Sequence, residues 1–145
     1  MSSSQIPPYT GSCLCGSIAY EVDHIERHMA HCHCTMCRKF HGAAFATFGE
    51  VRQDNFRWIR GTEFLQTYIA SNGTMRQFCN QCGSSMTFKA SQGQDGIIEF
   101  ALGTLDSELK LHPDAHIFVE SKASWFELND LLPKYAGGRD SDKEL

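Results

Sequence analysis

The sequence predicts a mainly β fold of short antiparallel sheets built around zinc, for three reasons. Aromatic residues recur from Ala43 onward and are separated by glycine-containing turns, which is typical of strands joined by tight connections. No long segment shows the 3.6-residue period of an amphipathic helix. The seven cysteines fall into three short groups, and their spacing is typical of zinc sites.

A chain of 145 residues is long enough for one domain with its own hydrophobic core. We expect that domain to cover residues 9–135, between flexible tails at 1–8 and 136–145. The formal net charge of −4 provides no general attraction to nucleic acid or anionic lipid. No run of about 18 apolar residues is present to span a membrane. We therefore expect neither nucleic-acid nor membrane partners.

The cysteines are predicted to bind metal rather than to form disulfides. Their number is odd, and the N-terminal segment has neither the basic nor the apolar region of a secretory signal. A cytoplasmic location is therefore expected. Clustered cysteines in a reducing cytosol usually hold metal or take part in catalysis.

The strands are expected where apolar residues alternate with polar ones or lie between turn residues. The later half of 9–22 alternates, and a second strand is expected from Arg27 into the next cysteines. The segment Cys37–Gly42 should form a turn or a single helical turn. Ser71-Asn72-Gly73 between two apolar runs predicts a hairpin. Further strands are expected at 86–88, 97–102 and 116–120.

Three cysteines lie within six residues, at Cys32, Cys34 and Cys37. Three thiolates can hold one zinc ion and leave its fourth position to water or to a substrate. Because alternate side chains of an extended segment share a face, Cys32 and Cys34 should point away from His31 and His33. The two histidines are therefore poor candidates for a fourth ligand. The sequence predicts an open three-sulfur zinc site.

The other four cysteines form two pairs. Cys79-Asn80-Gln81-Cys82-Gly83 is typical of a zinc knuckle, in which the glycine takes the tight backbone geometry after the turn. Cys13 and Cys15 should share a strand face, and Gly16 lets the strand bend. Together the two pairs would form a closed, structural four-sulfur site.

Spacing alone leaves two alternatives to this division. Cys34 and Cys37 also form a Cys-x-x-Cys pair, which could bind a metal together with Cys79 and Cys82. A histidine elsewhere in the chain could also complete the three-cysteine site, which would make every cysteine structural.

At these residues the sequence resembles the glutathione-dependent formaldehyde-activating enzyme family, also called the centromere-protein-V/GFA domain. The resemblance extends over roughly residues 9–135. The matching segments are Gly11-Ser12-Cys13-Leu14-Cys15-Gly16, Cys32-His33-Cys34-Thr35-Met36-Cys37-Arg38-Lys39, Arg76-Gln77-Phe78-Cys79-Asn80-Gln81-Cys82-Gly83-Ser84, Gly103-Thr104-Leu105-Asp106 and Pro113-Asp114-Ala115-His116-Ile117-Phe118.

This resemblance implies a β-tent fold similar to that of Mss4-like zinc proteins, with two zinc ions per chain. It implies carbon–sulfur lyase chemistry that joins formaldehyde and glutathione into S-hydroxymethylglutathione, or the reverse. The implied ligands are Cys13, Cys15, Cys79 and Cys82 for a structural zinc, and Cys32, Cys34 and Cys37 for a catalytic zinc. On this hypothesis a glutathione-like thiol binds as a substrate at the fourth position of the catalytic zinc.

Several neighbouring residues are candidates for assisting roles. Arg38 and Lys39 could offset the thiolate charge or hold a glutathione carboxylate. His41 could relay a proton, although a packing role is the simpler interpretation. His116 precedes an apolar run and is interpreted as a satisfied core histidine. Trp58, Trp125 and Phe126 are most simply core residues.

Two functions compete with the enzyme. A non-catalytic Mss4-like module would hold both metals structurally and bind a protein partner. A redox sensor would use Cys32, Cys34 or Cys37 as a reactive thiolate. A thiol that perturbs one of two zincs favours the enzyme, and tight zinc without a thiol response favours the module. Zinc loss on mild oxidation, reversed by a reductant, favours the sensor.

Overall fold

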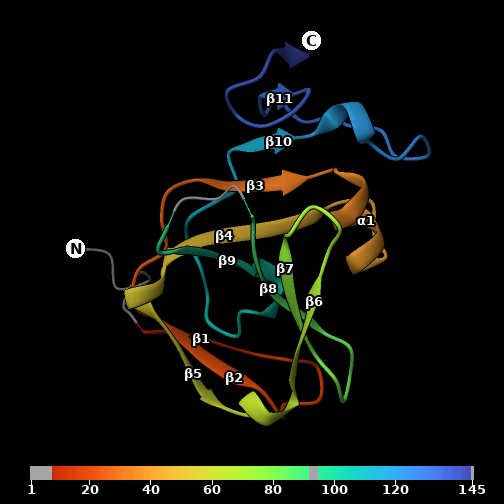
Figure 1. The fold of residues 1–145 in the computed structure, drawn as a ribbon. Coiled ribbons are helices and arrows are strands. Elements are labelled where there is room, and N and C mark those ends of the chain that lie inside the picture. Colours follow the sequence, from red (N-terminus) through yellow and green to blue (C-terminus); the bar gives the residue numbers. More distant parts are fainter. Residues whose placement is uncertain (1–7, 92–94, 145) are drawn as a thin grey trace. The chain divides into compact units, whose positions relative to one another are not determined.

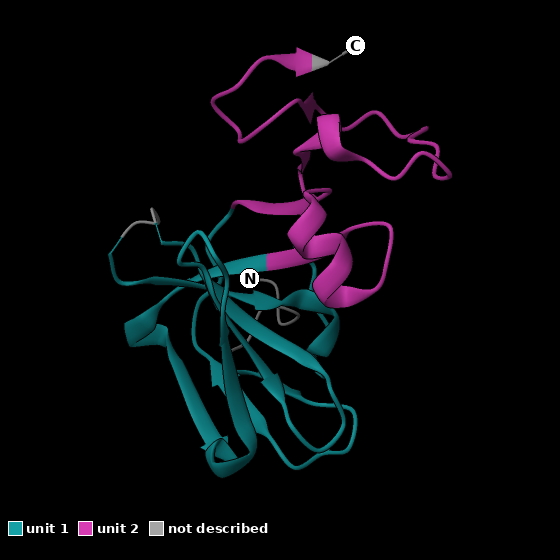
Figure 2. Ribbon diagram, turned by 45° about the vertical axis from the view of Figure 1, so that its right-hand side comes forward, with its two compact units in different colours: residues 1–27, 49–111 teal, residues 28–48, 112–145 magenta. Residues whose placement is uncertain are grey.

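The computed structural model describes residues 8–91 and 95–144, which form two compact units (Figures 1 and 2). Unit 1 contains residues 1–27 and 49–111, and unit 2 contains residues 28–48 and 112–145. Strand β4 (Ala46–Arg52) belongs in part to each unit. Apart from residue 8, the predicted N-terminal tail lies outside the described residues.

Unit 1 contains a three-stranded antiparallel sheet in the order β1-β2-β5. Its strands are β1 (Tyr9–Ser12), β2 (Ala19–Val22) and β5 (Phe56–Arg60). The buried ring of Tyr20 lies at its centre, with its centroid 5.1 Å from that of Phe56 and 5.6 Å from that of Phe100. The phenol oxygen lies 2.6 Å from Thr104 Oγ1, so the buried hydroxyl has a hydrogen-bond partner.

Four further strands of unit 1 pair in sequence order as an antiparallel meander. They are β6 (Leu65–Ile69), β7 (Met75–Cys79), β8 (Ser85–Lys89) and β9 (Ile97–Ala101). The predicted hairpin at Ser71-Asn72-Gly73 is confirmed, because it joins β6 to β7 and Gly73 has a φ of 90°. Short 3-10 turns occur at Gln53–Asn55, Thr62–Phe64 and Leu102–Thr104.

Unit 2 contains a small sheet in the order β12-β11-β10-β3 and one helix. The strands are β3 (Met29–Cys32), β10 (Ala115–Ile117), β11 (Lys134–Tyr135) and β12 (Lys143–Glu144), and the helix is α1 (Thr35–His41). β10 runs parallel to both β3 and β11, whereas β11 and β12 are antiparallel. Parallel pairing requires a long connection, and the second segment of unit 1, residues 49–111, lies between β3 and β10 in the sequence.

The prediction of a mainly β fold of short sheets is confirmed, and two details differ from the expectation. The parallel ladders of unit 2 depart from a purely antiparallel arrangement. The strand expected at 116–120 ends at Ile117, because Phe118 adopts a φ of 57° and leads into the 3-10 turn Val119–Ser121.

Residues 136–144, which the sequence assigns to a flexible tail, form the turn and return strand of a hairpin. Ala136 N donates to Asp142 O at 2.9 Å, and Gly137 N donates to Ser141 Oγ at 2.8 Å. The domain boundary at residue 135 stays a prediction.

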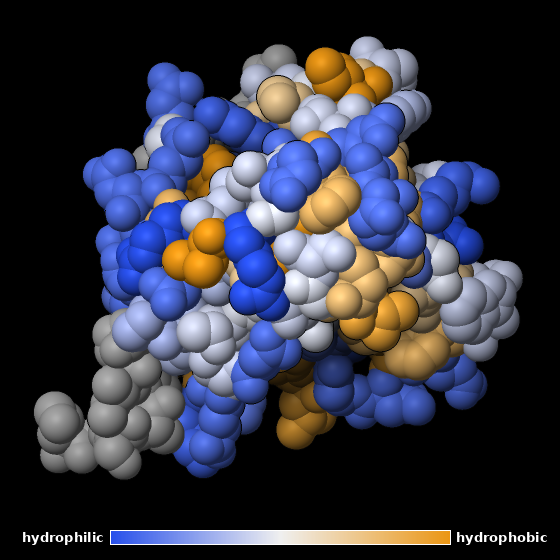
Figure 3. Space-filling view, turned by 90° about the horizontal axis from the view of Figure 1, so that it is seen from below, coloured by the Kyte–Doolittle hydropathy of each residue, from blue (hydrophilic) through white to orange (hydrophobic). Residues whose placement is uncertain are grey.

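The face drawn in Figure 3 is largely hydrophilic, and hydrophobic residues interrupt it in several places. Single exposed apolar side chains are normal on soluble domains. The large exposed examples in unit 1 are Leu14, Ile59, Tyr68, Ile69 and Met75, and those in unit 2 are Trp125 and Leu131. Within the described residues, no helix is long and apolar enough to cross a membrane.

Candidate metal centres

The sulfur atoms gather into two groups, each within one unit. Cys13, Cys15, Cys79 and Cys82 form the first group in unit 1, and all four Sγ atoms lie within 4.8 Å of one another. Cys32, Cys34 and Cys37 form the second group in unit 2 under the same limit. This division of the sulfurs is the one that the resemblance implies. All seven cysteines are free thiols, so none is used in a disulfide.

The backbone of unit 1 brings the four sulfurs together through two tight turns. Gly16 and Gly83, each directly after a cysteine, have φ values of 81° and 84°, which residues with a Cβ rarely adopt. Gly83 N donates to Cys79 O at 2.7 Å and Gly16 N donates to Cys13 O at 3.0 Å, closing each turn. The expectation that these two glycines permit the turns is confirmed.

The spacing of the four sulfurs fits a tetrahedral zinc ion. Zinc binds thiolates at about 2.3 Å, which places the sulfurs of a regular tetrahedron about 3.8 Å apart. Cys13 Sγ lies 3.7 Å from Cys15 Sγ, and Cys15 Sγ lies 3.9 Å from Cys79 Sγ. The donor set therefore suits a closed structural site.

Hydrogen bonds favour the thiolate form at two of these positions. Burial acts to raise the pKa of Cys82, but hydrogen bonds from the Ser84 side chain and backbone outweigh it and lower this pKa to about 6. The hydroxyl and amide of Ser17 lower the pKa of Cys15. Since a metal-binding cysteine must lose its proton, these contacts reduce the cost of loading.

The three-sulfur group of unit 2 is positioned where β3 ends and α1 begins. Cys34 is the N-cap of α1, and its Sγ accepts a hydrogen bond from Cys37 N at 3.3 Å. Cys37 then falls within the first turn of the helix, so both sulfurs lie near Cys32 Sγ. The predicted turn at 37–42 is the last part of this helix, which ends at Gly42 with a φ of 61°.

Hydrogen bonds among the three sulfurs of this group favour the protonated form of Cys32. Hydrogen bonds with Cys34 and Cys37, together with burial, raise the pKa of Cys32 well above its usual range. Three close thiolates repel one another unless a cation is present. Within the described residues no histidine or carboxylate atom joins these sulfurs inside the 4.8 Å limit. The donor set fits a zinc ion held on three sides.

A series of hydrogen bonds starts at His33, which lies between Cys32 and Cys34 in the sequence. His33 Nε2 lies 2.9 Å from His116 Nδ1, and His116 Nε2 lies 2.8 Å from Asp130 Oδ2. Since the carboxylate only accepts, His116 donates from Nε2 to Asp130. The Nδ1 atom of His33 is buried and has no hydrogen-bond partner within the described residues.

Two members of this network, His33 and Asp130, have shifted pKa values. Burial, followed by the nearby charges, lowers the pKa of His33 to about 4, so its imidazole is neutral at pH 7. The hydrogen bond from His116 is the main cause that lowers the pKa of Asp130 to about 2. The interpretation of His116 as a satisfied core histidine fits these contacts. The sequence carries no signal for Asp130, which lies in an exposed loop.

The model of the glutathione-dependent formaldehyde-activating enzyme family matches residues 8–121. The chain belongs to this family. The match includes all seven cysteines of the two sulfur groups. The predicted family is therefore confirmed.

Two known proteins are similar to this chain, one in sequence and one in structure. An uncharacterized lyase of Schizosaccharomyces pombe is 28% identical over 139 residues, which cover 88% of this chain and 96% of the relative. A Rhodobacter sphaeroides protein of known crystal structure superposes with a TM-score of 0.60 at 23% identity, covering 70% of this chain and 91% of that one. The second likeness shows the fold.

The structure places the predicted assisting residues of this family member in different surroundings. Arg38 is half-buried, and its guanidinium donates to Ser121 O at 3.0 Å. Lys39 is exposed. His41 packs between Phe40 and Phe48, with ring centroids 5.7 and 5.3 Å away.

One core assignment is wrong. Trp125 is 69% exposed, so it is a surface residue rather than part of the core. The composition of the segment around it does not reveal this, because Phe126 next to it is half-buried and packs edge-on against Phe45, with the ring centroids 5.7 Å apart.

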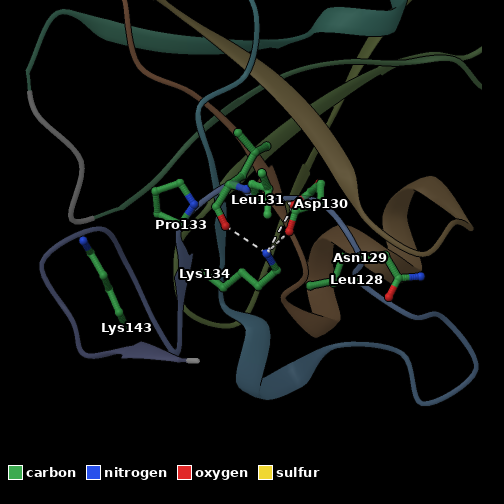
Figure 4. A pocket seen from close by; sticks show the side chains of 8 residues that line it. Leu128, Asn129, Asp130, Leu131, Pro133, Lys134 and Lys143 are labelled. Carbon is green, nitrogen blue, oxygen red and sulfur yellow. Dashed lines mark hydrogen bonds and ion pairs between the residues drawn. The ribbon is translucent and has the colours of Figure 1, made fainter.

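Two cavities lie within unit 2 of this family member. One, of about 320 Å³, is lined by Thr35, Arg38, Lys39, Gly42, Ala43 and Trp125. The other, of about 420 Å³, is lined by the 128–134 loop and Lys143 (Figure 4). In the second cavity Lys134 Nζ lies 3.2 Å from Asp130 Oδ1, and Lys143 lies over the Tyr135 ring. Both lysines of the second cavity, Lys134 and Lys143, therefore already interact with other side chains of the protein.

Proposed function

We propose that the chain is a zinc-dependent carbon–sulfur lyase that acts on a glutathione-like thiol and a small aldehyde. The observation that carries this proposal is the three-sulfur group, which has no fourth histidine or carboxylate ligand within the described residues. Membership of the family and a relative named as a lyase support it. The four-sulfur group of unit 1 would hold a second, structural zinc.

The proposed reaction is reversible addition of a thiol to an aldehyde. In the forward direction the thiol loses its proton and its sulfur electron pair forms a bond to the carbonyl carbon. The π pair of the carbon–oxygen double bond moves to the oxygen, which takes a proton to become a hydroxyl. In reverse the carbon–sulfur bond breaks, the hydroxyl proton is lost and the thiol leaves. No oxidant or reductant is consumed in either direction.

Cys32, Cys34 and Cys37 would hold the catalytic zinc. Bound there, zinc would act as a Lewis acid that favours the thiolate form of a substrate thiol at its open position. The chain itself supplies positive charge beside this site. Arg38 follows Cys37 directly, and Lys39 follows in the same turn of α1. We propose that both offset negative charge and orient an anionic substrate.

His41 is a weaker candidate for proton transfer. It lies on the same helix as Cys37, one turn further on, and its ring packs against Phe40 and Phe48. An imidazole held in this way can take one fixed orientation beside the site. Full turnover in a His41→Gln variant would show that His41 takes no part in proton transfer.

The free thiols of the chain also support a cytoplasmic location, which we propose on that ground. All seven cysteines are unpaired, a state that a reducing compartment maintains. Such a compartment also contains the glutathione that the reaction requires.

The proposal is tested by a zinc-edge X-ray absorption spectrum of the purified protein with and without glutathione. We expect one of two zincs to gain a sulfur neighbour when glutathione is added. Conversion of formaldehyde and glutathione to the hydroxymethyl adduct, followed by NMR, should accompany that change. Two zincs that are fully ligated by the chain and unaffected by thiol would instead indicate a structural module.

A further inference from the structure

Strand β6 is the outermost strand of the antiparallel meander in unit 1 (Figure 1). Within residues 8–91 and 95–144, β7 is the only strand that pairs with it, so its other edge has no strand partner. The last four of its five residues, Gln66 to Ile69, are all exposed. Because successive side chains of a strand point to opposite faces, β6 is open to solvent on both faces as well as along one edge.

The backbone register shows which groups face that free edge. Ala70 N donates to Thr74 O at 2.9 Å, and Asn80 N donates to Phe64 O at 2.8 Å. In an antiparallel ladder the N–H and C=O groups of one residue point to the same side, and the side alternates along the strand. The even-numbered residues of β6 therefore point these groups toward β7. The odd-numbered residues point theirs toward the free edge, and they are Leu65, Thr67 and Ile69.

The other sheet edges in the described part of the chain are protected in ways that natural sheets commonly use. Beside β1, Leu105 forms an isolated antiparallel bridge with Gly11. Strand β5 carries two arginines, and β12 has only two residues, both of them charged. Strand β6 has no charged residue, no proline and no bulge in its ladder with β7. It is therefore an edge that is ready to pair with another strand.

The side chains of β6 suit a second copy of the same strand. In an antiparallel pair centred on Thr67, Leu65 lies opposite Ile69 of the second copy, on the same face of the sheet. Ile69 is 63% exposed, and its cross-strand neighbour Met75 is 40% exposed. The pairing would therefore bury apolar surface that a single copy leaves in water.

Charge does not oppose this pairing, although the whole chain has a formal net charge of −4. The strand itself has no charged side chain. The acidic residue that precedes it, Glu63, would lie toward Ser71 of the second copy and not toward another carboxylate. Like charges therefore do not face one another across the proposed contact.

We propose that β6 pairs with β6 of a second copy of this chain, in an antiparallel, two-fold symmetric contact centred on Thr67. Each facing pair of free-edge residues can exchange two hydrogen bonds, which gives about six across the contact. Such a contact uses the same strand on both copies, so it closes as a dimer. Because a five-residue strand makes a small interface, we expect a weak dimer with a dissociation constant of about 10–100 μM.

Sedimentation velocity of the zinc-loaded protein measures this association. We expect a monomer at about 1 μM and mainly a dimer at about 1 mM. Thr67→Lys places like charges opposite each other and should raise the dissociation constant about fivefold or more. Ile59→Lys is the matched control, because it adds the same charge at an exposed apolar position on the edge strand β5. It should leave the association unchanged.

A second variant at the same position tests the register. Thr67→Glu alone should weaken the association about as much as Thr67→Lys does. An equimolar mixture of the two variants should associate at least as tightly as the wild type, because opposite charges then face each other. This restoration requires residue 67 to lie opposite its own copy. Circular dichroism checks that each variant keeps the fold.

Hydrogen exchange of the wild type gives a test that needs no variant. The amides of the three free-edge residues should exchange more slowly at about 1 mM than at about 1 μM. The amides of Gln66 and Tyr68 should be protected at both concentrations, since they face β7.

Several results would overturn the proposal. A wild type that stays monomeric up to about 1 mM would do so. Unchanged association in Thr67→Lys, equal weakening in Ile59→Lys, or no restoration in the mixture would do so as well. A dimer without added protection at the free-edge amides would place the contact on another surface and would also overturn it.

Discussion

His33 Nε2 lies 2.9 Å from His116 Nδ1, although 83 positions separate the two residues in the chain. Both side chains are fully or almost fully buried. The contact joins β10 to the segment between two zinc-ligand candidates, Cys32 and Cys34. Because Asp130 accepts from the far side of His116, the segment is held by a continuous series of hydrogen bonds that reaches the surface.

Replacing His116 with phenylalanine should destabilise the protein by about 2–4 kcal/mol. The ring volume is kept, but the buried imidazole of His33 loses its partner and Asp130 loses its donor. The free energy of unfolding in urea measures the effect. His112→Phe, at an exposed position of the same unit, is the control and should change stability by less than about 0.5 kcal/mol. Equal effects of the two changes would contradict the prediction.

The Asp130 carboxylate should contribute to stability in a pH-dependent way. Its pKa is lowered to about 2 in the folded protein, against about 3.9 in an unfolded chain. A depressed carboxyl pKa stabilises fully above the unfolded value, and the contribution is lost as pH falls from about 4 toward 2.

The measurement compares the wild type with Asp130→Asn across that pH range. Near pH 6 the difference should be about 1 kcal/mol, less than the pKa shift alone would give, since the carboxylate is nearly half exposed to screening water. By pH 2 the difference should have largely disappeared. Zinc loss in acid affects both proteins and cancels in the comparison. A difference that grows on acidification would show that the sign is wrong.

Cys34→Ser should separate catalysis from folding. Serine is a favoured N-cap, so its hydroxyl can accept the Cys37 amide that Cys34 Sγ accepts now, while the sulfur ligand is lost. We expect one zinc per chain, a folded protein and a fall in turnover larger than the roughly 10–100-fold that outer-shell changes cause.

Cys79→Ser provides the comparison in the other sulfur group. It removes a fully buried sulfur from the predicted structural site, and the binding energy of that metal is largely folding energy. We expect a marked fall in melting temperature. Metal analysis and circular dichroism on both variants check these expectations. Full activity in Cys34→Ser, or an undisturbed fold in Cys79→Ser, would reverse the roles assigned to the two groups.

Gly61 should tolerate alanine much less well than Gly96. Both have positive φ, 84° and 80°, so each substitution costs about 1 kcal/mol from the backbone alone. At Gly61 an added Cβ would also lie 2.0 Å from the carbonyl oxygen of Ser17, whereas at Gly96 no atom of the described residues lies within 4 Å. Chemical denaturation should show a difference of at least about 2 kcal/mol between the variants. Similar stabilities would mean that the Ser17 turn can move aside.

Local sequence patterns predicted the parts of this fold that depend on near neighbours. The Asn72-Gly73 hairpin is one example, because positive φ at glycine and the flanking apolar runs decide the turn within a few residues. The turns at Gly16 and Gly83 are another. The parallel pairing of β3 with β10 was not predicted, since strands so far apart in the chain leave no local trace of their partner.

The candidate site also has features that the sequence predicted and features that only the structure revealed. Cysteine spacing marked the ligand candidates, but it could not decide which pair joined which group. The exposure of Trp125 and the position of Asp130 beside His116 had no sequence signal, because both depend on how the loops after β10 return to the sheet.

The sequence by itself determined the β class, the family and which cysteines are candidate metal ligands, since these depend on residue type and short spacing. Only the tertiary structure decided that Cys13 and Cys15 meet Cys79 and Cys82, and that Arg38 and Lys39 share a cavity with Trp125. Such contacts join residues more than sixty positions apart. They are selected by the packing and hydrogen bonding of the whole fold rather than by any local conformational preference.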